Sequence, residues 1–257
     1  MKSETRHPKV LEGLSLRRVR YLPGTRQCRH HHDRTSLTLV FEGSLDEVVG
    51  RTREQAGPLS LVYKPAGTEH ANQIGPAGAA TLQIAFDPEF LPVGEDGPES
   101  WGWAHGGQPA TRFLALLDGV RRGEGDAAEL EALLFDAVAG LSGSDRTTST
   151  RPPRWLGSLV EELEDTYRAP RSVRHLAERA SKHPVAVARA HRRHYGCSIT
   201  DRLRARRVRE AAARLGTGES LSSIAHAAGF SDQAHMTRLF KRETGVTPGV
   251  FRSFITY

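Results

Sequence analysis

The chain contains little cysteine. Cys28 and Cys197 are the only two cysteines among its 257 residues, and they lie in different halves of the sequence. A small secreted domain that depends on disulfides carries more cysteines at regular spacing. The sequence therefore excludes a disulfide framework and favours a reducing compartment.

Long hydrophobic runs are also missing. No stretch approaches the roughly 18 apolar residues of a membrane-spanning helix, and the first residues show no apolar segment of the kind found in export signals. We therefore expect a cytoplasmic protein that has no membrane partner.

Positive charge is scarce in the N-terminal half and concentrated in the C-terminal half. Residues 151–257 contain 20 Lys and Arg against 10 Asp and Glu, whereas residues 1–150 contain 16 against 20. A basic field attracts polyanions, and phosphates that it neutralises release their counterions. We therefore expect the C-terminal part to bind nucleic acid.

The N-terminal part has the composition of a β domain. Between residues 10 and 92, short runs of β-branched and apolar residues alternate with Gly and Pro. Many short strands of this kind are typical of a barrel or a sandwich. We expect strands at 35–41, 59–63 and 80–86, and a surface loop at 92–108.

Helices are expected after this loop. Apolar residues recur at helical spacing over 109–121 and 126–141. Such a pair either covers the barrel or pairs with another copy of itself. The following segment, 142–153, is polar, small and proline-terminated, which is typical of a linker.

The part that follows the linker is predicted to be all-helical and built from a repeat. Periodicity predicts helices over 155–167 and 200–215, and the second is long enough to join two separate units. Around it one pattern occurs twice: apolar positions of the first copy recur 48 residues later, and Arg189 recurs 49 residues later as Arg238. Each copy has a support helix, a turn of small residues and a second helix, which is the order of a helix-turn-helix.

The second helix of each copy carries a row of residues suited to reading bases. Gln can pair with adenine and Arg with guanine in the major groove, and Thr or Ala can contact a thymine methyl group. The first copy offers fewer donors, so we expect the second to discriminate bases more strongly. Basic residues later on the same helices favour phosphate contact. The predicted base-facing residues are Val185, Ala188, Arg189, Gln233, Ala234, Thr237 and Arg238, and the predicted phosphate-facing residues are Arg192, Arg193 and Lys241.

The second copy resembles the signature of the AraC/XylS family of transcription regulators. The matching residues run Ile224-Ala225-x-x-Ala228-Gly229-Phe230-Ser231-Asp232-Gln233-x-His235 and end with Gly245-Val246-Thr247-Pro248-x3-Phe251-Arg252. The resemblance covers about 105 residues. It implies two subdomains that read successive major-groove segments about one helical turn apart.

The first copy departs from that family at two positions. His191 stands where the family usually has an aromatic residue, and Val187 stands where it usually has leucine. A buried histidine prefers to be neutral and hydrogen-bonded, so we expect His191 in that state.

A histidine pattern marks the N-terminal part. It runs Gly24-x5-His30-x-His32-x3-Ser36, followed by Pro65-x-Gly67-x2-His70. Alternate residues of a strand point to one face, and a later strand can bring His70 to the same place. Three imidazoles suit a divalent first-row metal and leave coordination positions open. The alternative is a polar strand edge that binds no metal.

This pattern resembles the two motifs of the cupins, which are small β-barrels with a metal in the mouth. Ser36 stands where the usual glutamate ligand would be. The resemblance implies a sensor barrel with His30, His32 and His70 as metal or effector ligands.

These features predict an α+β multidomain protein. The expected order is a cupin-like effector domain at 1–108, a helical dimerisation segment at 109–141, a linker at 142–153 and an AraC-type all-α DNA-binding domain at 154–257. We expect a transcription activator that acts as a cytoplasmic homodimer and binds a double-stranded DNA operator and RNA polymerase. A small effector or a divalent metal in the barrel would control it. The alternative is a metal-dependent cupin enzyme with an appended helical domain.

Overall fold

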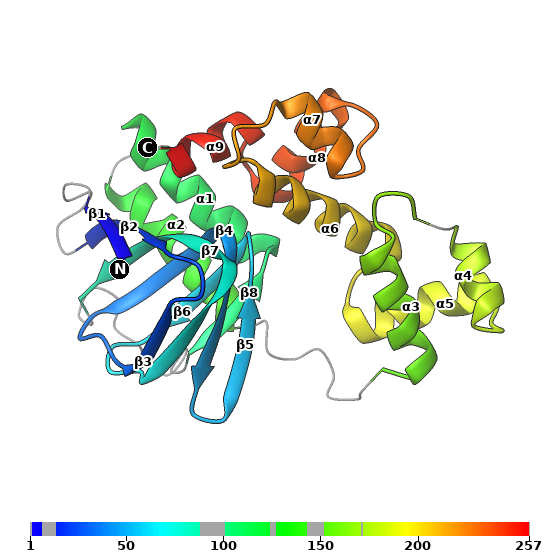
Figure 1. Cartoon of the computed structure of the whole chain (residues 1–257), viewed down its shortest axis with the longest axis horizontal. Coiled ribbons are helices and arrows are strands. Elements are labelled where there is room, and N and C mark those ends of the chain that lie inside the picture. Colours follow the sequence, from blue (N-terminus) through cyan, green and yellow to red (C-terminus); the bar gives the residue numbers. More distant parts are fainter. Residues whose placement is uncertain are drawn as a thin grey trace.

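The computed structural model describes residues 2–6, 14–87, 101–123, 127–142, 152–170 and 172–256. An N-terminal antiparallel sheet is followed by a pair of helices and then by a C-terminal helical part (Figure 1). The strands are β1 (Lys2–Arg6), β2 (Leu14–Tyr21), β3 (Arg26–His30), β4 (Thr35–Val49), β5 (Thr52–Ala56), β6 (Ser60–Lys64), β7 (His70–Phe86) and β8 (Gly102–His105).

Two long strands organise the sheet. The strand order is β1-β2-β7-β4-β6-β8, with β3 paired to β7 and β5 paired to β4. The register of β4 against β7 shifts between Val40 and Glu42 and again between Gly43 and Leu45. Gly43 has a φ of 70°, and a Cβ there would collide with the carbonyl oxygen of Gly78. These bulges bend both strands and curl the sheet into a cupin-like shape.

Side chains of β4 alternate between two environments. Ser36 and Thr38 line cavities inside the curled sheet. Leu37, Leu39 and Phe41 point the other way and belong to the main hydrophobic core. The same strand therefore borders both the inside of the sheet and the helices outside it.

Helices α1 (Gly107–Arg122) and α2 (Ala127–Ser142) cover the outer face of the sheet. They pack against each other and against β6 and β8. The apolar face predicted for α1 is buried, including Phe113, Leu116 and Leu117. On α2, Leu134 is buried but Phe135 is 38% exposed. The pair thus covers the sheet of its own chain.

The C-terminal part contains two helix-turn-helix subdomains joined by one long helix (Figure 1). Its helices are α3 (Arg154–Asp165), α4 (Val173–Arg179), α5 (Pro184–Tyr195), α6 (Ile199–Arg214), α7 (Leu221–Ala227), α8 (Gln233–Thr244) and α9 (Pro248–Thr256). The hydroxyl groups of Ser172, Ser198 and Ser220 cap α4, α6 and α7. The connecting helix predicted at 200–215 is confirmed as α6.

The two subdomains differ in how they are anchored. The first has a core of its own, made by α3, α4, α5 and the start of α6. The second shares its core with the sheet and with α1, and Phe41 of β4 contacts Phe251 of α9. In Figure 1 the first subdomain accordingly projects away from the sheet, whereas α8 of the second subdomain packs against α1.

Several strands carry little pattern in the sequence. β3 and β5 are largely polar, and β8 lies in the segment predicted to be a surface loop, so that prediction is wrong for Gly102–His105. β8 forms a strand because it pairs with β6. Ser60 lies opposite His105, and Tyr63 lies opposite Gly102. Residues 92–100 of that loop and most of the linker predicted at 142–153 lie outside the described residues. Among the described helices, none combines the length and hydropathy that a membrane crossing requires.

Candidate functional site

The two reading helices, α5 and α8, begin where the sequence predicts. Asp232 Oδ1 accepts a hydrogen bond from the backbone N–H of His235 at 2.7 Å and caps α8. Pro184 lies in the first turn of α5, and His183 Nδ1 accepts a hydrogen bond from the N–H of Val185 at 3.3 Å. Both helices end at a glycine in the left-handed conformation.

The predicted base-facing residues lie on the solvent side of these helices. On α8 they are exposed except for half-buried Thr237, and Met236 and Phe240 on the opposite side are fully buried. On α5 they are all exposed, and Val185 is 50% exposed although it is apolar. Because the sequence predicts that these residues face bases, we call them the DNA-reading surface: Val185, Ala188 and Arg189 on α5, and Gln233, Ala234, Thr237 and Arg238 on α8. The predicted phosphate-facing residues Arg192, Arg193 and Lys241 are also exposed.

His191 is fully buried on the inner side of α5, as expected. Its Nε2 accepts a hydrogen bond from Arg202 Nε at 2.9 Å, so Nδ1 carries the proton and donates to the carbonyl of Cys197 at 2.8 Å. Burial, and secondarily the positive charge of Arg202, lower the pKa of His191. The imidazole is therefore neutral and hydrogen-bonded, and it ties α5 to α6.

Helix α6 separates the two reading helices. Its 16 residues span about 24 Å at 1.5 Å per residue. On α3, Glu164 pairs with Arg202 at 3.5 Å and with Arg206 at 3.3 Å. Arg207 Nε donates to the carbonyl of Tyr167 at 2.9 Å. Some of the arginines that make this half of the sequence basic therefore hold α6 against the first subdomain. The sequence alone does not predict this structural role.

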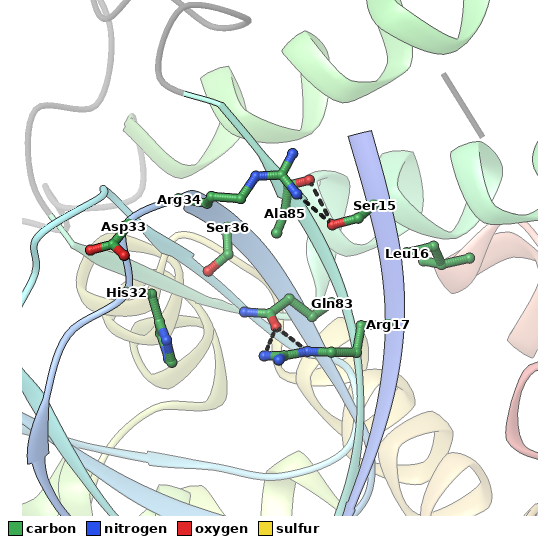
Figure 2. Close-up of a pocket in the computed structure, with 9 residues that line it drawn as sticks. All are labelled: Ser15, Leu16, Arg17, His32, Asp33, Arg34, Ser36, Gln83 and Ala85. Carbon is green, nitrogen blue, oxygen red and sulfur yellow. Dashed lines mark hydrogen bonds between the residues drawn. The ribbon is translucent and has the colours of Figure 1, made fainter. Parts of the chain in front are cut away.

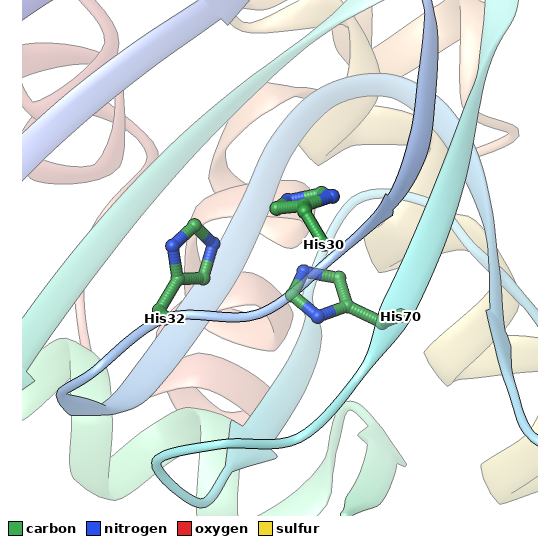
Figure 3. Close-up of side chains that lie close together, drawn as sticks. All are labelled: His30, His32 and His70. Carbon is green, nitrogen blue, oxygen red and sulfur yellow. The ribbon is translucent and has the colours of Figure 1, made fainter.

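His30, His32 and His70 converge inside the curled sheet (Figure 3). One ring nitrogen of each lies within 4.8 Å of the others, which is close enough for one ion. His30 ends β3 and His70 begins β7, where the two residues are paired. His32 lies just beyond β3, so the chain turn rather than strand alternation brings it to the cluster. Cys28, in contrast, is exposed.

Hydrogen bonds prepare two of these imidazoles to bind a metal. His30 Nδ1 donates to the carbonyl of Cys28 at 2.8 Å, and His70 Nδ1 donates to the carbonyl of Thr68 at 2.9 Å. Because each Nδ1 holds the proton, each Nε2 presents a lone pair. The Nε2 of His70 is buried and has no hydrogen-bond partner among the described residues. An ion would satisfy it.

The same environment favours the neutral form of two of these histidines. Burial lowers the pKa of His32 to about 4, with further effects from His70 and Lys64. Burial and then Lys64 lower the pKa of His70 to about 4 as well. At neutral pH these imidazoles are therefore unprotonated, which is the state that coordinates metals.

A buried ion pair beside the histidines was not predicted from the sequence. Lys64 Nζ lies 2.6 Å from Glu47 Oε1, and the carboxylate is 1% exposed. Its Oε2 accepts hydrogen bonds from the indole nitrogens of Trp101 at 2.6 Å and Trp103 at 3.1 Å. The signal in the sequence is a charged residue in each of two strand-forming runs, but strand register is needed to pair them.

The comparisons with known proteins agree with this arrangement. Residues 176–253 match a family described as a helix-turn-helix domain. The transcriptional activator RhaR of Escherichia coli K12 is 27% identical over 244 residues, which cover 87% of this chain and 86% of RhaR. The transcriptional regulator GlxA of Rhizobium meliloti is 32% identical over 126 residues, which cover 48% of this chain and 38% of GlxA. The chain thus spans less than half of GlxA and most of RhaR.

Two solved structures are similar at low sequence identity. ToxT from Vibrio cholerae O395 is 10% identical with a TM-score of 0.42, covering 96% of this chain and 99% of ToxT. A cupin superfamily protein from Desulfitobacterium hafniense is 15% identical with a TM-score of 0.31, covering 34% of this chain and 78% of that protein.

Two helix-turn-helix subdomains on one connecting helix, together with relatives that are transcription regulators along most of their length, define a DNA-binding transcription regulator. The cupin-enzyme alternative is therefore set aside. In its C-terminal part the chain is similar to transcription regulators of the helix-turn-helix type, as the resemblance to the AraC/XylS signature implies, and the curled N-terminal sheet precedes this part.

Proposed function

We propose that the chain is a sequence-specific regulator that reads an operator with α5 and α8 and is controlled from the curled sheet. The observation that carries this proposal is the pair of exposed, donor-bearing rows at the two ends of α6. A connector of about 24 Å plus the width of the flanking helices suits two major-groove segments about 34 Å apart.

The two helices of the DNA-reading surface differ in how many base contacts they can make. Arg238 and Gln233 supply paired donors and acceptors for guanine and adenine, and Thr237 and Ala234 suit a thymine methyl group. On α5, Arg189 supplies the base contact beside two apolar side chains. Arg192, Arg193 and Lys241 lie later on the same helices and would contact phosphates.

The histidine cluster is proposed as a divalent metal site. His30, His32 and His70 would hold the ion through ring nitrogens, and in the sequence motif Ser36 takes the position of the usual glutamate ligand. Three imidazoles are a donor set that suits Zn, Fe, Ni or Cu. When bound, the metal would supply open positions for an effector, so it serves here as a sensor group.

Control would pass from the sheet to the second subdomain by direct contact. β4 carries Thr38 on its inner face and Phe41 on its outer face, and Phe41 packs on α9. Thr111 of α1 also donates a hydrogen bond to the carbonyl of Glu243, at the end of α8, at 3.1 Å. A ligand that prefers one arrangement of β4 would therefore shift the population of α8 orientations.

The assembly and its partners extend the same proposal. RhaR is named an activator, and activation here would require contact with RNA polymerase in the cytoplasm. We expect a homodimer that pairs through the segment 109–141, where Phe135 of α2 stays partly exposed beside Ala132 and Ala139. A dimer would place four reading helices on one operator.

Selection of bound sequences from random double-stranded DNA by the full chain tests this function. We expect one enriched motif with two conserved blocks about one helical turn apart. Arg238→Ala should lose preference at one position of one block, whereas Arg53→Ala on β5 should leave the motif unchanged. Failure to enrich any motif would refute sequence-specific reading.

A further inference from the structure

A second cavity opens at the edge of the curled sheet, beside His32 (Figure 2). Its volume is about 420 Å³, and β2, β4, β7 and the loop after β3 line it. The space around the histidine cluster is about 40 Å³, which holds an ion with a few waters but no organic effector. His32 borders both spaces, so an occupant of the larger cavity would lie next to the cluster.

Ser36 gives this cavity an unsatisfied polar group. Its side chain projects into the cavity and the residue is 1% exposed (Figure 2). Its Oγ has no hydrogen-bond partner among the described residues. Oγ1 of Thr38, the next inward residue of β4, is also buried and has no hydrogen-bond partner among the described residues. Buried hydroxyls without partners are rare because they lower stability, and a bound ligand would explain them.

Arg17 gives the cavity a positioned positive charge. Its Nε and Nη2 donate to Gln83 Oε1 at 3.0 Å and 2.5 Å. These bonds fix the plane of the guanidinium at the cavity wall. They also turn the amide nitrogen of Gln83 toward the side of Ser36 (Figure 2). Three kinds of donor, a guanidinium, an amide and a hydroxyl, therefore face one space.

Other charges near the cavity are paired with acids or face water. Arg34 Nε lies 2.9 Å from a carboxylate oxygen of Asp87. The side chain of Asp33 is 98% exposed. Arg17 lies in the wall of both spaces and is bound to the amide oxygen of Gln83.

We propose that this cavity binds the carboxylate of a small organic acid through Arg17, Ser36 and Gln83. A planar guanidinium matches a carboxylate, and the hydroxyl and amide complete its hydrogen bonds. The volume fits a small acid. This inference rests on the proposed function, because it names the class of effector that the regulator senses.

Calorimetric titration of the full chain tests the inference. The probes are benzoate, malonate and succinate, each compared with its uncharged amide, in chloride buffer with a chelator so that no metal contributes. We expect at least one acid to bind at least tenfold more tightly than its amide. Ser36→Ala should weaken that binding at least tenfold without loss of folding, because Oγ has no partner to lose. Arg17→Met should weaken it further.

A matched control and two further outcomes complete the test. Arg53→Met, on exposed β5, should leave acid binding unchanged. Equal affinity for acids and amides, no binding by any probe, or unchanged binding by Ser36→Ala and Arg17→Met would overturn the inference. Inorganic phosphate that binds as tightly as the best acid would overturn the assignment to carboxylates. Sequence-selective DNA binding, measured separately, would then still support the proposed function, and its absence would refute that function instead.

Discussion

Phe41 of β4 packs against Phe251 of α9, and their ring centroids are 5.0 Å apart. Phe251 packs in turn against Phe240 of α8, with centroids 5.4 Å apart. Strand β4 is therefore linked, through its outer face, to α8 by two aromatic contacts. The first subdomain has no such route among the described residues, because its core is separate. Control from the sheet should therefore act on the second subdomain first.

Phe41→Ala should loosen this link. Loss of a fully buried aromatic side chain costs about 3–5 kcal/mol of unfolding free energy. Hydrogen exchange should speed up in α8 and α9 as well as in β4, while α4 and α5 keep their protection. Leu163→Ala, in the core of the first subdomain, should give the opposite pattern. Equal acceleration in both subdomains by Phe41→Ala would contradict the separate anchoring.

The histidine cluster should bind one divalent ion. Titration of the metal-free chain with Zn²⁺ at neutral pH should show one site, and the melting temperature should rise with Zn²⁺ concentration. His70→Ala removes a buried ligand and should reduce the affinity at least tenfold. His31→Ala is the matched control, since His31 is a neighbouring exposed histidine outside the cluster. Affinity that is the same in both variants would refute the site.

The same histidines should make stability depend on pH in a defined direction. The pKa values of His32 and His70 are lowered to about 4 in the folded chain, below the ordinary 6.5. Between these values the unfolded chain binds more protons than the folded chain. The free energy of unfolding should therefore fall as the pH decreases from about 6.5 to about 4. Denaturant titrations of the metal-free chain at several pH values measure this slope.

Comparison with a variant isolates the contribution of the cluster. His70→Gln removes one titrating group, so its slope between pH 6.5 and 4 should be shallower than that of the original chain. The other titratable groups are present in both proteins, so their contributions cancel when the two unfolding free energies are subtracted at each pH. A difference that stays constant over this range would show that His70 is not held neutral.

The helices were predictable because their signals are local. Pro184 starts α5, Gly216 follows the end of α6, and the periodic apolar residues of α8 are the ones that are buried. The sheet was less predictable. β3 has polar side chains, and its pairing with β7 depends on residues 40 to 47 positions away. The histidine pattern still predicted the cluster, because the spacing of the three histidines can be recognised in the sequence without knowing the strand register.

The rest of the candidate site required the fold. Ser36 stands where the cupin motif usually has a glutamate, but nothing in the sequence shows that its hydroxyl is buried and has no hydrogen-bond partner. Arg17 lies in a run of basic residues and looks like solvent-exposed charge until Gln83 is placed opposite it. The contact of Phe41 with Phe251 joins positions 210 residues apart, and no local pattern indicates such a pair.

Phosphate and base contacts should respond differently to salt and sequence. Lys241→Ala should weaken binding to cognate and scrambled operators alike and reduce the slope of log affinity against log salt by about one. Arg238→Ala should cost about 1–3 kcal/mol on the cognate operator and relax one base position. Fluorescence anisotropy at several salt concentrations measures both. Equal losses on cognate and scrambled DNA for Arg238→Ala would contradict a base-reading role.

His191→Phe tests whether the unusual residue of the first subdomain is structural. The substitution restores the aromatic type common in the family, but it leaves the carbonyl of Cys197 and the Nε of Arg202 without their partner. An unsatisfied buried polar group costs about 1–3 kcal/mol, so the first subdomain should be destabilised although the new side chain is more apolar. Hydrogen exchange of α5 should quicken, with α7 and α8 unchanged. A variant as stable as the original chain would show that packing alone governs this position, and that the hydrogen bonds of His191 add nothing to the first subdomain.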